Sequence, residues 1–248
     1  MKIASQLLST IIPLALAAAS GLLAAYPLDG YEETGIRRVE GARLAHEGLA
    51  KGGKQPPGAL LTSAQVDLRL LNEDMALPPV DPAFTAEVRA LLGENAEHYG
   101  VAVLDLTDRD NPRYAEHRGD YRQNVGSVGK LLAALGLFQA LADAWPDDLE
   151  QRASVLRNTV MTADNFSHSD HHTIRLFNVQ TKQLTRRRLA NGDQGSLWEY
   201  LDWMLSVSSN SAASMVMRDA MLLRHFGKTI LYPKHRLTVF FPRHRKVN

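Results

Sequence analysis

The chain contains no cysteine, and this absence excludes several kinds of chemistry at once. A protein without cysteine has no disulfide, no thiolate ligand for zinc and no cysteine nucleophile. It also has no lipid-modified cysteine at its N-terminus. We therefore look for its chemistry among serine, lysine, histidine and carboxylate side chains, and we predict no bound cofactor and no bound metal.

The chain also has little excess of charge of either sign. Its 28 lysines and arginines nearly balance its 27 acidic residues, and the net charge is +1. This balance gives no reason to expect nucleic acid or an anionic membrane surface as the partner. With 248 residues, of which 45% are hydrophobic, the chain can form one sizeable domain with its own core.

One long hydrophobic run stands at the N-terminus. Lys2 precedes an uncharged, largely apolar stretch from Ile3 to Tyr26 that ends in small residues such as Ala24 and Ala25. This pattern is typical of an export signal, here residues 1–25, although a run of about 20 residues also suits a retained membrane anchor. We therefore expect a periplasmic or secreted protein, or one held in the inner membrane by this segment alone.

Composition divides the rest of the chain into three parts. Residues 26–80 are polar and mixed and include a linker rich in glycine and proline from Lys51 to Gly58, so we interpret them as an N-terminal extension and linker. Residues 81–226 carry the periodic apolar patterns of a folded domain. Residues 227–248 form an atypical basic tail, in which no acid balances the lysines and arginines.

The first part of this domain predicts a helix followed by a β-hairpin. Asp81 can cap a helix, and Pro82 suits its first position. Tyr99 to Leu106 is short and partly β-branched, and a segment rich in turn formers separates it from a return strand at Arg113 to His117. This part of the domain therefore supplies an antiparallel strand pair.

The apolar spacing then changes to that of helices. From Val125 to Leu141 the apolar residues recur mostly every three or four positions, which predicts a deeply buried helix. Further helices are expected from Asp147 to Val160, from a capping box formed by Ser196 and Glu199, and from Ser211 to Leu223. The domain is thus predicted to be α+β.

The most informative pair of side chains is Ser127 and Lys130, at the start of the predicted buried helix. A spacing of three places both side chains on one helical face, within reach of each other. A serine hydroxyl becomes a good nucleophile when a neighbour takes its proton, and a lysine removed from water can do this. The same spacing also arises from a helix cap followed by a solvated lysine, so the pair needs supporting context.

That context resembles class A β-lactamases and penicillin-binding proteins. The hairpin runs directly into Ser127, and a second segment, Ser208-Ser209-Asn210, follows in the order of the family's Ser-Asp-Asn motif, with Ser209 in place of the aspartate. The resemblance implies a β-lactamase/transpeptidase-like fold, with a helical subdomain beside an antiparallel sheet. It also implies that Ser127 is the nucleophile and Lys130 its base, that Ser208 relays a proton to the leaving group, and that Asn210 holds the substrate amide and the lysine. By itself the second segment also fits an ordinary polar turn between helices.

The family's third motif, Lys-Thr/Ser-Gly on a cleft strand, has no counterpart here. Gly227-Lys228-Thr229-Ile230 lacks the glycine and follows the last predicted helix too closely. No acidic residue follows Asp219, so the deacylating glutamate of class A β-lactamases is missing as well. We therefore interpret the fold as incomplete, with its C-terminal strands lost by truncation or a changed reading frame after about Phe226, and we expect low activity and low stability.

Two other groups of residues could carry a function. Ser167 to His172 contains imidazoles and a carboxylate, and His168 and His172 are spaced as metal ligands on a helix would be, but the segment is rich in turn formers and favours a solvated polar loop. Trp198, Tyr200 and Trp203 lie on a predicted helix, where core packing explains them better than a sugar-binding platform.

The sequence therefore predicts a serine hydrolase that forms an acyl-enzyme through Ser127. Its partner would be a β-lactam or a peptide amide of peptidoglycan, and nucleic acid is not expected. Two alternatives stay open: a noncatalytic protein of the cell envelope that keeps the fold, and an inactive truncated fragment. The oligomeric state is not indicated by any pattern in the sequence.

Overall fold

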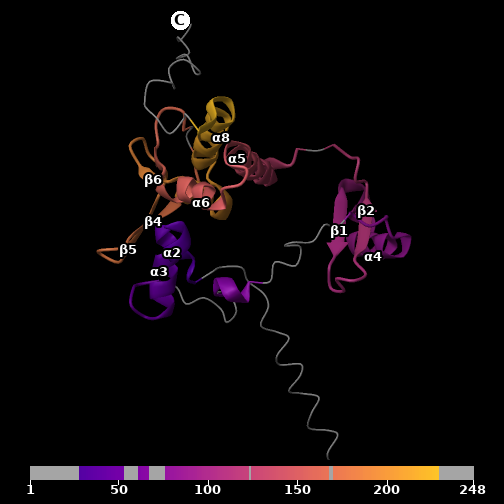
Figure 1. Cartoon of the computed structure of the whole chain (residues 1–248). Coiled ribbons are helices and arrows are strands. Elements are labelled where there is room, and N and C mark those ends of the chain that lie inside the picture. Colours follow the sequence, from indigo (N-terminus) through magenta and orange to yellow (C-terminus); the bar gives the residue numbers. More distant parts are fainter. Residues whose placement is uncertain (1–27, 53–60, 67–75, 123, 168–169, 229–248) are drawn as a thin grey trace, which may run out of the picture. The chain divides into compact units, whose positions relative to one another are not determined.

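The computed structural model describes residues 28–52, 61–66, 76–122, 124–167 and 170–228. Within these ranges the protein is α+β, with helices and three small antiparallel sheets (Figure 1). The helices are α2 (Gly30–Thr34), α3 (Arg37–His46), α4 (Pro82–Leu92), α5 (Lys130–Ala144), α6 (Leu149–Asn158), α7 (Leu197–Ser206) and α8 (Asn210–Phe226). The strands are β1 (Val101–Asp105), β2 (Arg113–His117), β3 (Val160–Thr162), β4 (Ile174–Asn178), β5 (Gln183–Arg187) and β6 (Gln194–Ser196).

The chain forms two compact units. One comprises residues 67–126, and the other comprises residues 1–66 together with residues 127–248. The predicted signal or anchor, most of the glycine- and proline-rich linker, His168 and the tail beyond Lys228 lie outside the described residues.

The smaller unit contains α4 and the β1–β2 hairpin. Asp81 caps α4 by accepting hydrogen bonds from the Ala83 and Phe84 amides at 2.9 and 3.0 Å, and Pro82 occupies the first helical position. Strands β1 and β2 pair antiparallel from Val101↔His117 to Asp105↔Arg113. Both the capped helix and the hairpin predicted from the sequence are thus confirmed.

The larger unit is built around α5, α7 and α8. Strand β6 leads into α7 through the predicted capping box, in which Ser196 Oγ accepts from the Glu199 amide and the Glu199 carboxylate accepts from the Ser196 amide. Helices α5 and α8 lie side by side (Figure 1). Helix α7 packs against both. The core between them contains fully buried large side chains, among them Leu137, Tyr200, Trp203, Met204, Met215 and Val216.

The prediction of a deeply buried helix from Val125 is wrong. A single turn of 3-10 helix, η3 (Gly126–Gly129), precedes α5, and only Ala134, Leu137, Ala140 and Leu141 of α5 are buried. The opposite side is exposed, with Leu131, Leu132 and Leu135 at 61%, 70% and 62%. The reason is geometric: α7 and α8 cover one stripe of α5, whereas the apolar sequence runs all round it.

The stretch Gly126–Ala144 is also the one described helical segment that is long and apolar enough to cross a membrane, with a mean hydropathy of 1.2. Only 22% of that window is buried. Length and composition alone are weak grounds for a membrane span, since core helices of soluble proteins meet the same criteria.

Two strand pairs in the larger unit were not predicted. Strand β3 pairs with β6, and β4 pairs with β5, both antiparallel. Helix α3 lies against β4 (Figure 1). Phe177 of β4 packs so closely on Gly41 of α3 that a Cβ atom on Gly41 would stand 2.7 Å from the ring. This small hairpin thereby holds the N-terminal helices against the body that contains α5, α7 and α8.

Candidate active site

Ser127 lies in η3, immediately before α5. Side chains three residues apart eclipse one another in a 3-10 helix, so this turn directs Ser127 and Lys130 to the same side. The turn begins at Gly126, whose φ of +55° lies in the left-handed region that glycine adopts without strain. Ser127 is exposed and Lys130 is half-buried, so the hydroxyl is accessible from solvent.

The second segment, Ser208 to Asn210, connects α7 to α8. Ser208 has a φ of +59°, which is uncommon for a residue other than glycine. Ser209 is the N-cap of α8: its hydroxyl accepts a hydrogen bond from the Ala212 amide at 3.2 Å. Asn210 is the first residue of α8, so the turn places both Ser208 and Asn210 at the N-terminal end of that helix.

The structure brings the four residues singled out from the sequence together, with Ser127, Ser208 and Asn210 around the amine of Lys130. Lys130 Nζ lies 2.9 Å from Ser127 Oγ, 3.1 Å from Ser208 Oγ and 2.7 Å from Asn210 Oδ1. Ser208 and Asn210 are 78 and 80 residues away from Lys130 in the chain, so the packing of α5 against α8 creates this arrangement.

The number of neighbours matches the hydrogen-bonding capacity of the Lys130 amine. As an ammonium, Lys130 has three N–H groups and can donate to all three oxygens. As a free amine it has two N–H groups, for Ser208 and Asn210, and one lone pair, which can accept the Ser127 proton. Both forms are therefore satisfied without movement of the neighbouring side chains.

No protein-family model, curated protein or solved structure matches the chain. Support for a function therefore lies in the geometry of the site and in the motifs that form it.

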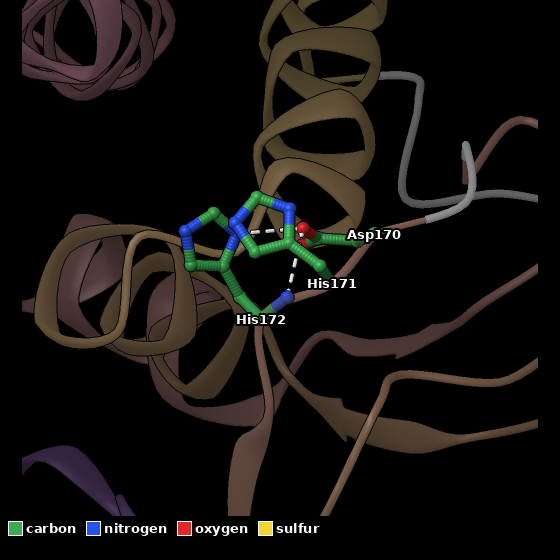
Figure 2. Close-up of side chains that lie close together, drawn as sticks. All are labelled: Asp170, His171 and His172. Atoms are coloured by element: carbon green, nitrogen blue, oxygen red, sulfur yellow. Dashed lines mark hydrogen bonds and ion pairs between the residues drawn. The ribbon is translucent and has the colours of Figure 1, made fainter.

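The loop before β4 contributes a carboxylate that the sequence analysis did not assign to the site. Asp170 Oδ2 accepts hydrogen bonds from Ser209 Oγ at 2.9 Å, from the Asn210 amide at 2.5 Å and from the Ser211 amide at 3.2 Å. Asp170 Oδ1 accepts from the amide and the ring Nδ1 of His172, at 3.1 and 2.6 Å (Figure 2). The prediction of a solvated polar loop is thus wrong for Asp170, whose side chain is only 1% exposed. The carboxylate is buried because five donors replace water around it.

These hydrogen bonds also determine the charge state of Asp170. Burial alone would raise the pKa of this carboxyl, but the hydrogen bonds from His172, Ser209 and Ser211 outweigh burial and hold the pKa well below its ordinary value. The N-terminus of α8, which carries a partial positive charge, favours an anion at the same place. Asp170 is therefore a buried carboxylate anion beneath the Ser208–Asn210 turn.

Asp170, His171 and His172 could be considered as metal ligands, since each offers one ligand atom within 4.8 Å of the others (Figure 2). The hydrogen bonds argue against this use. Both oxygens of Asp170 already accept protein donors, and His172 uses Nδ1 for one of them. The rings of His171 and His172 lie against each other with centroids 3.9 Å apart. We interpret the cluster as a support for the turn.

Proposed function

We propose that the protein is a serine hydrolase of the β-lactamase and penicillin-binding type, which forms an acyl-enzyme through Ser127 with a β-lactam or a peptide amide of the cell wall. One observation carries the proposal: Lys130 Nζ is within 3.1 Å of the Ser127 and Ser208 hydroxyls and of the Asn210 amide oxygen. Acyl transfer requires a nucleophile and a base beside it. Here the proposed base is the Lys130 amine, and the Ser127 hydroxyl and a second hydroxyl, that of Ser208, lie beside it.

The proposed reaction begins with the free amine of Lys130. Ser127 Oγ attacks the carbonyl carbon of the amide while its proton passes to Lys130 Nζ, and a tetrahedral intermediate forms. Lys130 then donates a proton to Ser208 Oγ as Ser208 transfers its own proton to the leaving nitrogen. The C–N bond breaks, and the carbonyl remains on Ser127 as an ester. By resemblance to the family motif, Asn210, whose Oδ1 accepts from Lys130 Nζ, would orient the substrate amide.

The order of the elements supports the finer assignment of the fold. Helix α4 precedes the β1–β2 hairpin, the hairpin precedes η3 and α5, and the Ser208–Asn210 turn lies between two later helices. This is the order on which the resemblance to class A β-lactamases and penicillin-binding proteins was based. We extend the proposal to a β-lactamase/transpeptidase-like fold and to action in the cell envelope, as the N-terminal pattern of residues 1–25 indicates.

Labelling with a fluorescent penicillin tests the proposal. Because low activity is expected of this chain, the incubation must be long; each labelled molecule should then gain the mass of one penicillin, and peptide mapping should locate the adduct on Ser127. Ser127→Ala should abolish labelling, and Lys130→Ala should slow it by about 10²-fold or more, because the serine loses its base. The control is Ser206→Ala, which removes an exposed hydroxyl at the end of α7 and should label at the rate of the unmodified chain.

The outcomes separate the functional classes. Covalent labelling that depends on Ser127 and Lys130 supports an acyl-serine enzyme. Reversible binding of penicillin without an adduct indicates a noncatalytic envelope protein, and labelling that persists in Ser127→Ala shows that the nucleophile is a different residue. With no glutamate assigned to activate water, we expect the adduct to persist rather than turn over rapidly.

A further inference from the structure

The second segment differs from the motif that it resembles at one position, where Ser209 replaces an aspartate. Ser209 is completely buried, and its hydroxyl donates to Asp170 Oδ2 while accepting from the Ala212 amide. A carboxylate is thus present beside Ser209 after all, but a residue 39 positions earlier in the chain supplies it.

The contacts of Asp170 hold the backbone on the C-terminal side of Ser208. The amides of Asn210 and Ser211 both donate to Asp170 Oδ2, and these residues form the first turn of α8. The first amides of a helix have no partner within the helix, so an acceptor at this place fixes where the helix begins. With the start of α8 fixed, Ser208 and Asn210 have little freedom to move away from Lys130.

His172 holds the carboxylate in turn. Its amide and its ring Nδ1 both donate to Asp170 Oδ1 (Figure 2). One carboxylate oxygen is thus held by His172 and the other by the turn. His172 lies two residues before β4, whose first residue Ile174 is fully buried. The support for the turn is therefore connected to the core of the larger unit.

We infer that Asp170 is the positioning residue of the active site: from the loop before β4 it supplies the carboxylate that the Ser208–Asn210 segment lacks, and it thereby holds Ser208 and Asn210 on Lys130. Its effect on catalysis rests on the proposed function, whereas its effect on the backbone of the turn does not. Asp170 touches no reacting atom, so its removal should lower the rate of acylation through Ser208 and Asn210 rather than remove the nucleophile.

Moving the carboxylate from one segment to the other tests this inference. Asp170→Ala leaves the turn without an acceptor, and the rate of Ser127 labelling should fall on the order of a hundredfold, as misplacement by about an ångström can cost. Ser209→Asp alone places two carboxylates against each other and should also label slowly. The double variant, Asp170→Ala with Ser209→Asp, restores one carboxylate in the vacated space and should label faster than either single variant.

Hydrogen exchange gives a readout that does not depend on activity. The Asn210 and Ser211 amides should exchange faster in Asp170→Ala and be protected again in the double variant. Asp170→Asn keeps the volume of the side chain, so it provides the same comparison if Asp170→Ala does not fold. The matched control is Asp164→Ala in the same loop, because the Asp164 carboxylate binds Arg218 and not the turn. It should leave the Ser127 labelling rate of the folded protein unchanged.

The experiments distinguish failure of the proposed function from failure of the positioning role of Asp170. If the unmodified chain is not labelled by penicillin, the proposed function fails, and the exchange of the two amides still tests the role of Asp170. The positioning role is overturned if these amides exchange equally in Asp170→Ala, Asp170→Asn and the unmodified chain. It is also overturned if a labelled chain loses nothing on Asp170→Ala, or if the double variant is no better than the two single ones.

Discussion

Ser208 combines an unusual backbone conformation with a hydroxyl that bonds to Lys130. Its φ of +59° places it in the left-handed region, which costs a residue with a Cβ atom about 1–2 kcal/mol. Glycine would occupy this position without strain, yet glycine has no hydroxyl to lie 3.1 Å from Lys130. Strained residues tend to occur at functional sites, where side-chain chemistry outweighs the cost to the backbone. Ser208 fits this pattern.

Two substitutions at Ser208 separate the backbone effect from the side-chain effect. Both Ser208→Gly and Ser208→Ala remove the hydroxyl, so both should lower the Ser127 labelling rate to a similar level. Ser208→Gly should be more stable than Ser208→Ala by about 1 kcal/mol, because only alanine keeps the strain. Chemical denaturation measures the difference, and equal stabilities would show that the position is not strained.

Individual site residues were predictable from the sequence to different degrees. Four residues follow a motif order in the sequence, and in the structure three of them, Ser127, Ser208 and Asn210, bond to the fourth, Lys130. Asp170 was missed, because the burial of a carboxylate depends on its donors, and Ser209, Asn210 and Ser211 lie 39 to 41 residues further along the chain. The local sequence around Asp170 contains only turn formers and histidines, which are typical of a solvated loop.

At the scale of elements, α5 has two unlike sides that are both apolar. Leu137 is completely buried against the core, whereas Leu132, on the same helix, is 70% exposed. The exposed side also includes Leu131 at 61% and Leu135 at 62%. Exposed apolar side chains of this kind on the helix that follows Ser127 raise the tendency of the protein to associate.

Two leucine substitutions in α5 measure the contrast. Leu137→Ala should lower the free energy of unfolding by about 2–5 kcal/mol, because it leaves a cavity in the core. Leu132→Ala should change it by no more than about 0.5 kcal/mol, as expected for a surface position. Urea denaturation of both variants checks the prediction. A large loss in Leu132→Ala would reveal that this side of α5 is covered in solution.

Elements with a local signal were the most predictable. The Asp81 cap, the hairpin that ends at His117 and the Ser196–Glu199 capping box each depend on residues close together in sequence. The β4–β5 pair was missed, since all of β5 is exposed and has no apolar alternation. The burial of α5 was overestimated because composition does not show which side of a helix its neighbours cover.

At the scale of the whole molecule, ion pairs join the N-terminal helix α3 to helix α7 of the larger unit. Arg37 pairs with Glu199 at 2.7 Å, and Arg38 pairs with Asp202, so that α3 is held on α7. The Arg38 and Asp202 side chains are each only 9% exposed. Residues that looked like a polar extension therefore belong to the same folded unit as Ser127.

Breaking one of these pairs should destabilise the whole unit. Arg38→Ala or Asp202→Ala should cost about 3–5 kcal/mol, because either change removes one member of a buried ion pair. The double variant Arg38→Met with Asp202→Leu should recover much of the loss, since neither charge remains. The control is Glu47→Ala, which breaks a solvent-exposed pair with Arg43 and should cost at most about 1 kcal/mol. Thermal or chemical denaturation measures all four variants.

The long sequence separation between two arginines of α3 and their acidic partners in α7 affects the order in which the protein folds during synthesis. Arg37 and Arg38 bond to acids 162 and 164 residues further along the chain. At a synthesis rate of about 5–20 residues per second, α3 leaves the ribosome roughly 8–30 s before α7. During that time Arg37 and Arg38 lack the α7 carboxylates to which they bond in the folded protein, and α7 cannot yet exclude water from them. The body that carries Ser127 therefore closes only after α7 and α8 have been synthesised, and contacts between residues so far apart in sequence make that closure slow.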